Sequence, residues 1–186
     1  MAPNLDLGTP LTDGAVELRL IDERDLPLLE RAARDSEIAA RFGLRNRRPS
    51  DYLAAFQKGW SEGKAAAFAV SEVGGDSVGQ VLFEVREAGR ADVGYWLVRE
   101  ARGRGLATRA LRLVATWALR QPAIARLQLW TTPENSASLG VAERSGFTRE
   151  GVLRSYAPAE NGRRVDAVFF SLLPGDLSAG TGCGDR

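Results

Sequence analysis

Histidine is absent from all 186 residues of this chain, and cysteine occurs only once, at Cys183. Without histidine the chain cannot form a Ser/His/Asp or Cys/His nucleophile arrangement, and a hydrolytic metal site cannot use imidazole ligands. A single cysteine supports neither an intrachain disulfide nor a cysteine-based zinc site. A carboxylate-only metal site has no visible signature, so we expect no metal and no covalent cysteine or histidine chemistry.

An excess of charge of one sign and a long hydrophobic run are also lacking. The 25 Lys and Arg residues nearly balance the 24 Asp and Glu residues, so the net charge of +1 gives no overall attraction to nucleic acid. The apolar stretches are well short of the roughly 20 residues that span a bilayer, and no basic start precedes an apolar signal core. We therefore expect a cytoplasmic protein that binds no nucleic acid directly and no membrane.

The apolar fraction of 44% is enough for one domain of this length to bury a core without disulfide or metal support. Residues 1–14 mix Pro, Gly and Asp without periodicity and are expected to form a flexible lead-in. Residues 178–186 are rich in glycine and are expected to form a flexible tail. The folded unit is therefore predicted to be a single domain over residues 15–177.

Hydrophobic periodicity predicts seven strands separated by helices and turns. The strands are expected at residues 16–21, 66–73, 78–87, 91–98, 125–132, 147–157 and 163–173. Helices are expected at residues 26–35, 36–42, 51–63 and 135–146, with a longer amphipathic helix that ends before Pro122. This order indicates an α+β (mixed α/β) domain with a mostly antiparallel sheet of about seven strands, flanking helices and one parallel β-α-β crossover.

The most informative segment is the turn Arg102–Ala107, with sequence RGRGLA, between a predicted strand and the long helix. Glycines let the backbone approach a ligand, and the first-turn amides of the following helix have no partners of their own. Together with the helix dipole they form a phosphate cradle. Five arginines flank the turn, against one acid, Glu100: Arg99, Arg102, Arg104, Arg109 and Arg112. The alternative is a tight turn with a solvated basic face; the spacing matches neither the Rossmann fingerprint nor the P-loop.

The RGxGxA pattern, preceded by a strand ending in GYWLV and followed by a long helix, resembles the acyl-CoA pyrophosphate turn of GNAT acetyltransferases. The resemblance implies a GNAT-like fold and acetyl-CoA as co-substrate. It implies that the CoA diphosphate is bound along the turn by Arg102, Gly103, Arg104, Gly105, Ala107 and Thr108. It further implies that Leu97 and Val98 offer main-chain groups to the pantetheine arm in a wedge between diverging parallel strands, with an oxyanion donor N–H near Val98.

A second group of motifs is similar to the N-x-x-S, K-x-G-F and E-G-x-x-R run of the RimJ/RimL-like branch of that superfamily. The matching segments are residues 133–138 (PENSAS), 143–147 (ERSGF) and 150–154 (EGVLR). Arg144 and Ser145 replace the usual Lys-Leu pair, on a turn expected to face solvent. The resemblance extends over residues 15–177.

Acetyl transfer to a primary amine needs a neutral nitrogen, stabilisation of the oxyanion, and an acid for the leaving thiolate. Without a suitable nucleophile in the chain, we expect the amine to attack acetyl-CoA directly in a ternary complex. Asp92 and Glu84 are the candidates for the general base. Asp92 is preferred because it directly precedes GYWLV, where the resembled branch often carries an acid. The alternative for both is a strand carboxylate paired with an arginine.

The resemblance also assigns Ser138 to protonating or orienting the CoA sulfur and Asn135 to binding the pantetheine or sulfur region. The alternative is structural, because asparagine is a strong helix N-cap and Ser138 would lie at N3 of the same helix, an arrangement worth about 1 kcal/mol. Tyr95 and Tyr156 are alternatives to Ser138, although aromatic packing is the commoner role of a buried tyrosine.

The acceptor side is expected to involve the helices between residues 36 and 63. Its candidate walls, each of which could equally be ordinary core, are Phe42, Tyr52, Trp60 and Trp96. The arginine run at residues 45–48 is either a solvated loop or an attraction for an acidic acceptor.

The function favoured by these features is an acetyl-CoA-dependent N-acetyltransferase that acts on a protein N-terminus or a small-molecule amine. One alternative is a catalytically inactive acyl-CoA-binding, sensing or interaction module, and another is a nucleotide- or phosphosugar-binding protein that uses the same helix N-terminus. A homodimer is favoured over a monomer, through an edge strand expected near residues 163–173.

Overall fold

The computed structural model describes residue 7 and residues 9–159 and 162–179 of the chain. Eight strands form one sheet in the order β1-β2-β3-β4-β5-β6-β8-β7. The strands are β1 (Leu11–Thr12), β2 (Val16–Leu20), β3 (Ala65–Glu72), β4 (Gly79–Val85), β5 (Arg90–Leu97), β6 (Arg126–Thr131), β7 (Thr148–Pro158) and β8 (Arg164–Leu172). Only β5 and β6 are paired in parallel. The α+β fold with a mostly antiparallel sheet and one crossover is therefore confirmed.

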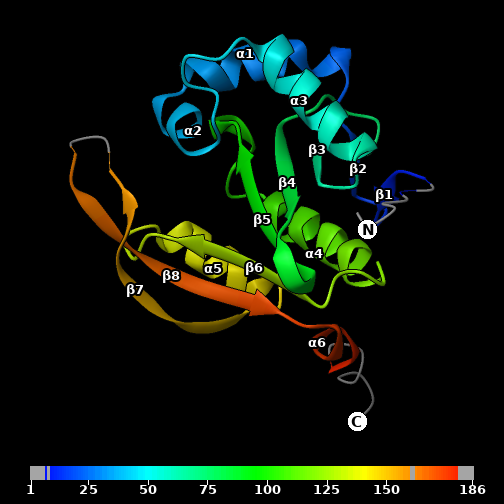
Figure 1. Ribbon diagram of the computed structural model, residues 1–186. Coiled ribbons are helices and arrows are strands. Elements are labelled where there is room, and N and C mark those ends of the chain that lie inside the picture. Colours follow the sequence, from blue (N-terminus) through cyan, green and yellow to red (C-terminus); the bar gives the residue numbers. More distant parts are fainter. Residues whose placement is uncertain (1–6, 8, 160–161, 180–186) are drawn as a thin grey trace.

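Helices cover both faces of this sheet (Figure 1). They are α1 (Leu26–Arg34), α2 (Ser36–Arg41), α3 (Pro49–Ser61), α4 (Leu106–Leu119), α5 (Ser136–Arg144) and α6 (Pro174–Ala179). Phe68 and Phe83 meet Trp117 of α4 edge-on, with ring centroids 5.1 and 5.2 Å apart. Gln80 accepts a hydrogen bond from Tyr52 of α3. Because side chains alternate along a strand, Phe83 and Gln80 point to opposite faces, with α4 on one and α3 on the other.

The β1 strand is the eighth strand and lies inside the segment expected to be a lead-in. Leu11 pairs with Leu18 of β2, and the Thr12 hydroxyl donates to the Val16 carbonyl oxygen at 2.9 Å. The sequence showed no alternation here because two residues are too few for a period-2 pattern. At the other end of the chain, α6 extends two residues past the predicted boundary of the folded unit.

The expectation that residues 163–173 form an edge strand is wrong. These residues contain β8, which pairs with β6 on one side and with β7 on the other. The two edges of the sheet are β1 and β7. Local alternation is the same for an edge strand and a central strand, so it did not reveal the order of the last two strands.

Small residues let α3 pack closely against β3. A Cβ atom placed on Gly59 of α3 would lie 2.9 Å from the Cβ atom of Ala65, closer than real Cβ atoms approach each other. The first five residues of β3 include four alanines, and Ala66 and Ala67 are fully buried. This close contact holds the α1–α3 layer on the face of the sheet opposite α4.

Within the described ranges, no helix is long and apolar enough to cross a membrane. The same part of the chain holds no group of three or more Asp, Glu, His or Cys side chains that could bind a metal ion.

Candidate active site

The parallel strands β5 and β6 pair over only three residues and then separate. The paired residues run from Arg90 with Arg126 to Asp92 with Gln128, and in the described chain no later pair joins the two strands. Beyond this point β5 pairs only with β4, and β6 only with β8 (Figure 1). The wedge expected between these strands is therefore present, with Asp92 and Gln128 at its apex.

The edge of β5 that faces the wedge carries the main-chain groups of every second residue. The Val98 N–H donates to the Val78 carbonyl oxygen at 2.9 Å, toward β4. In an antiparallel pair this direction alternates along the strand, so the main-chain groups of Val93, Tyr95 and Leu97 point toward the wedge. The Val98 amide itself is thus unavailable as an oxyanion donor, and the nearest available N–H groups are those of Leu97 and Tyr95.

The Gly-rich turn follows β5 and opens directly into α4. Gly103 and Gly105 both have φ of +77°, the left-handed region that favours glycine. A Cβ atom at either position would meet nothing within 4 Å, so the space in front of the turn is open. Gly105 is the N-cap of α4 and provides no side-chain cap, so no side chain caps the first amides of this helix. This geometry is compatible with the anion cradle that the sequence predicts, and anion binding at the turn stays a prediction.

Three of the arginines beside the turn are held by partners instead of projecting freely. Arg102 Nε donates to the Leu97 carbonyl oxygen at 3.0 Å. Arg104 forms an ion pair with Glu72 at 2.6 Å, and Arg109 forms one with Asp13 at 2.8 Å. These acids come from β3 and from the turn after β1, so the sequence around the glycines did not reveal them. The positive charge near the turn is therefore partly neutralised within the protein.

Ser138 and Tyr95 lie together on the α5 side of β5. The Tyr95 hydroxyl donates to Ser138 Oγ at 3.1 Å, and Asn135 Oδ1 accepts from the Ser138 amide at 3.0 Å. Asn135 is the N-cap of α5, so its structural role is confirmed. Burial raises the pKa of Tyr95, and the hydrogen bond to Ser138 only partly opposes that shift. At neutral pH Tyr95 therefore keeps its proton, which leaves the Ser138 hydroxyl hydrogen available to a further acceptor.

Asp92 and Glu84 share one arginine near the apex of the wedge. Arg86 Nε donates to Asp92 Oδ2 at 2.7 Å, while the other end of its guanidinium group contacts Glu84 at 2.5 Å. The second Asp92 oxygen accepts from Gln128 Nε2 at 2.7 Å. The hydrogen bond that Arg86 donates to Asp92 is the largest cause that raises the pKa of Arg86. Both carboxylates are thus paired with an arginine, as expected if they have a structural role. Of the two candidates for the general base, Asp92 lies nearer to the wedge, because it is at the apex.

A third carboxylate, Glu150 of the E-G-x-x-R motif, forms a separate ion pair. Arg126 Nη1 donates to Glu150 Oε1 at 2.9 Å, and the Ser171 hydroxyl donates to the same oxygen at 2.7 Å. These contacts, led by the hydrogen bond from Arg126, lower the pKa of Glu150 to about 2. A carboxylate with so low a pKa is a poor proton acceptor near neutrality. The contacts of Glu150 indicate a structural role instead, in which its hydrogen bonds link β7 to β6 and β8.

Most of the aromatic residues expected to wall the acceptor side belong to the core. Tyr52 and Trp96 are 1% and 3% exposed, and Trp60 stacks on Trp117 with centroids 6.2 Å apart. Phe42 is the exception, because it is half-buried and its ring lies 3.4 Å from the position of a Cβ atom on Gly94. Phe42 therefore covers β5 two residues beyond the apex.

An exposed aromatic cluster that the sequence did not reveal is formed by residues of β6, β7 and β8. Tyr156 packs edge-on against Trp130, with centroids 5.4 Å apart, and against Phe169 at 4.9 Å. Trp130 and Tyr156 are 42% and 41% exposed. These contacts engage Tyr156, whereas Tyr95 is the tyrosine that reaches Ser138. The three residues are distant in sequence, so only the pairing of β6, β7 and β8 brings them together.

Gln80 Nε2 and Thr131 Oγ1 are among the buried polar atoms that lack hydrogen-bond partners in the described structure. Thr131 is the last residue of β6, and Gln80 is the β4 neighbour of Trp96. Neither was singled out from the sequence, because a polar residue in an alternating strand is normally assigned to the solvent face. Buried polar groups without partners are uncommon, and they identify these positions as further site candidates.

Comparison with known proteins gives one consistent family. The family model for the acetyltransferase (GNAT) domain matches residues 15–148. The chain is 34% identical over 115 residues to an uncharacterized N-acetyltransferase, p20, of Bacillus licheniformis, in an alignment covering 60% of this chain and 64% of that protein. Across the curated relatives that it matches, the chain spans between 45% and 64% of their length.

Solved structures show the same fold at low sequence identity. Mycobacterium smegmatis RimJ in complex with CoA-disulfide superposes with a TM-score of 0.75 and 22% identity, over 97% of this chain and 98% of RimJ. An acetyltransferase described as modifying the N-terminal serine of a 50S ribosomal subunit protein from Salmonella typhimurium superposes with a TM-score of 0.74 and 22% identity, over 86% of this chain and 95% of its own.

Proposed function

Because this chain belongs to the acetyltransferase (GNAT) domain family, we propose that it transfers the acetyl group of acetyl-CoA to a primary amine. The observation that carries this proposal is the continuous path from the turn at Gly103 and Gly105, along the free edge of β5, to the apex of the wedge. An anion cradle at one end and a reaction centre at the other fit an elongated thioester better than they fit a compact nucleotide.

In the proposed complex, the amides of the Gly-rich turn and the first turn of α4 bind the diphosphate. The pantetheine arm lies along β5 and exchanges hydrogen bonds with Leu97 and Tyr95, in place of the strand partner that β6 no longer supplies. Val98 contributes through its buried side chain only, since its N–H is bonded to β4. Asn135 positions α5, and through it Ser138, against the sulfur end of this arm.

The proposed reaction is direct attack in a ternary complex, with no covalent enzyme intermediate. The amine nitrogen forms the new bond to the acetyl carbon while the carbon–sulfur bond breaks, and an N–H group on the wedge edge stabilises the oxyanion. The thiolate takes a proton or a hydrogen bond from Ser138, whose oxygen is held by Tyr95. The proton lost by the amine passes to Asp92 or to solvent water beside it, with Glu84 as the second candidate.

For the acceptor, we favour the free amine of a protein N-terminus over a small-molecule amine. The support is the description of the structural neighbour that modifies the N-terminal serine of a ribosomal protein. The exposed rings of Trp130 and Tyr156 offer a surface suited to a peptide, because aromatic surfaces bury apolar side chains and favour cations. If the protein forms a homodimer by strand pairing, β7 is the longer of the two edge strands open for it.

The experiment that tests this proposal is a calorimetric titration with acetyl-CoA, with ATP and NAD as controls. Gly105→Trp should fill the open space before the turn and abolish binding. Gly162→Trp is the matched control, because Gly162 also has positive φ (+74°) and open space but lies at the β7–β8 turn. Acetyl-CoA binding lost only in Gly105→Trp supports the cradle, whereas equal binding of ATP would refute it.

Turnover separates an enzyme from a binding module with the same fold. Thiol release from acetyl-CoA should accelerate when peptides with free N-termini or simple amines are added. Acetyl-CoA binding without thiol release for any amine in such a panel would favour the inactive acyl-CoA-binding module.

A further inference from the structure

A groove of about 690 Å³ lies between one wall formed by Leu7 and residues 9–13 and the outer face of α4. Its helical wall is a stripe of residues three or four positions apart, which lie on one side of a helix. Members of this stripe include Arg109, Arg112, Leu113, Thr116, Trp117 and Arg120. The groove borders β1, and β2, β3 and β4 separate β1 from β5 in the sheet. It is therefore distinct from the wedge.

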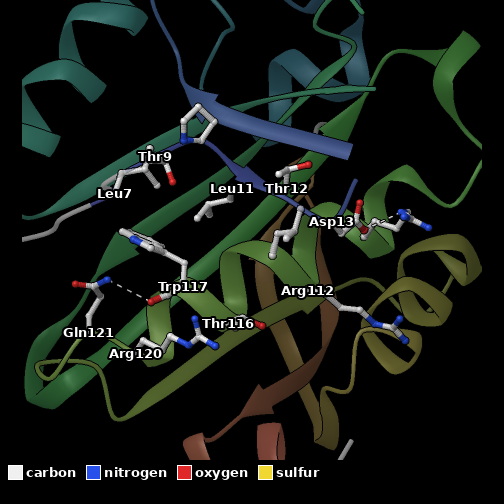
Figure 2. Close-up of a pocket in the computed structure, with 13 residues that line it drawn as sticks. Leu7, Thr9, Leu11, Thr12, Asp13, Arg112, Thr116, Trp117, Arg120 and Gln121 are labelled. Carbon is white, nitrogen blue, oxygen red and sulfur yellow. Dashed lines mark hydrogen bonds and ion pairs between the residues drawn. The ribbon is translucent and has the colours of Figure 1, made fainter. Parts of the chain in front are cut away.

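The groove is charged at its ends and apolar between them. Figure 2 shows Arg120 and Gln121 at one end and Asp13 with Arg112 at the other, with Leu11 and Trp117 between them. Leu11 and Leu113 are half-buried and pack against the core. Arg109 and Arg120 are 11 residues apart, which corresponds to about 16 Å along the helix axis. The groove thus offers an elongated apolar floor.

The charged groups in the groove do not cancel. Three lining residues are arginines, and among the described lining residues Asp13 is the sole acid. Asp13 forms an ion pair with Arg109, which leaves the charges of Arg112 and Arg120. Arg112 donates to the main-chain oxygen of Arg144, which carries no formal charge. The guanidinium of Arg120 makes no hydrogen bond or ion pair with any other described residue. This end of the groove therefore has an unpaired, exposed cation beside apolar surface.

We infer that this groove binds a small anionic amphiphile, a molecule that carries one carboxylate or phosphate group and an apolar chain. The anionic group pairs with Arg120, since guanidinium groups bind carboxylate and phosphate with two parallel hydrogen bonds. The apolar chain lies on Leu113 and Leu11, between β1 and α4. The volume falls within the range of known small-molecule pockets. This inference does not depend on acetyl transfer, because it uses none of the residues of the wedge.

The test is titration of the full-length protein with octanoate and octyl phosphate, with 1-octanol and inorganic phosphate as controls. We expect one octanoate per chain with a dissociation constant on the order of 1 mM, a value suited to so small a ligand. Octyl phosphate should bind at the same site, and the comparison of the two shows which headgroup is preferred. Both control molecules should bind more weakly, because 1-octanol lacks the anionic group and inorganic phosphate lacks the apolar chain.

Substitutions in the groove test whether octanoate binds there. Arg120→Gln should weaken octanoate binding about fivefold or more, whereas Arg120→Lys should restore it only in part, because the charge is kept but the two parallel hydrogen bonds of the guanidinium are lost. Thr116→Phe should fill the groove and abolish binding. Arg34→Gln is the matched control, because Arg34 is an exposed arginine in the last turn of α1 and lies outside the groove. Melting temperatures show that each variant is folded.

Three results would overturn the inference. Arg120→Gln could bind octanoate as tightly as the unaltered protein, or 1-octanol could bind as tightly as octanoate. Saturating acetyl-CoA could displace octanoate, which would place octanoate in the wedge. Because octanoate binding is measured without turnover, its failure is distinguishable from a failure of the proposed acetyltransferase activity.

Discussion

The hydroxyl of Tyr95 donates a hydrogen bond of 3.1 Å to the hydroxyl oxygen of Ser138. Tyr95 lies on β5 and Ser138 on α5, so this bond joins the free edge of the wedge to the helix that covers it. The two residues were alternatives when only the sequence was considered. The structure shows that they belong to one unit, in which the tyrosine fixes the serine oxygen and leaves the serine hydrogen free.

Tyr95→Phe should slow thiol release about tenfold, because Ser138 loses the donor that orients it. Ser138→Ala should have a larger effect, and the double variant should be no slower than Ser138→Ala alone because the two residues act together. Acetyl-CoA affinity, measured by calorimetry, should change little in all three. Strictly multiplicative effects of the two single variants would contradict a shared role. The rates require an acceptor amine found by the turnover screen.

Asp92→Asn should reduce the rate by about a hundredfold or more if Asp92 receives the proton, with acetyl-CoA affinity preserved. Glu84→Gln serves as the comparison, since Glu84 contacts the same arginine but lies one strand further from the apex. Equal losses in the two variants would indicate that the ion-pair network, and not Asp92 itself, is required. The measurement is the pH dependence of thiol release for each variant.

The Glu150–Arg126 pair should contribute stability that is lost in acid. The pKa of Glu150 is lowered to about 2 from an ordinary value of 4.5, so this contribution is complete above pH 4.5. It declines as the pH falls from about 4.5 to 2, because the folded protein must then protonate a carboxylate that it holds charged. Glu150→Gln should remove this part of the acid sensitivity, to an extent limited by solvent screening of the half-exposed pair.

Urea unfolding at pH 7 and at pH 3 measures the effect. Glu150→Gln should lower the free energy of unfolding at pH 7 and have a smaller effect at pH 3. Glu134→Gln, at an exposed glutamate that forms none of the ion pairs seen in the described chain, should have no pH-dependent effect. A loss of equal size at both pH values in Glu150→Gln would rule out the ion pair as its cause.

Gly59→Ala should destabilise the protein, although alanine is the better helix former by about 1 kcal/mol. The new Cβ atom would lie 2.9 Å from the Ala65 Cβ atom and force α3 away from β3, a strain of about 1–3 kcal/mol.

The matched variant for Gly59→Ala is Gly140→Ala in α5. There the nearest atom, at 2.8 Å, belongs to the mobile end of the Arg144 side chain, which can move aside. Thermal melting should therefore show a lower transition for Gly59→Ala and an unchanged or higher one for Gly140→Ala. The reverse order would mean that the close contact of α3 with β3 is not rigid.

Local patterns in the sequence identified most of the elements because each depends on neighbouring residues. The turn at Gly103 and Gly105 was recognisable because its conformation requires glycine and because a helix follows at once. The lack of histidine limited the chemistry before any fold was considered. The residues named for the candidate site, and their roles, stay predictions.

The sequence by itself therefore determined the elements, the available chemistry and the position of the Gly-rich turn, all of which are local properties. Only the tertiary structure decided which strand is the edge, which amides of β5 face the wedge, and which acids hold Arg104 and Arg109. These properties depend on strand order and register, which join residues far apart in the chain. The direction of the Val98 N–H, for example, follows from its pairing with Val78, and no pattern within β5 alone contains that information.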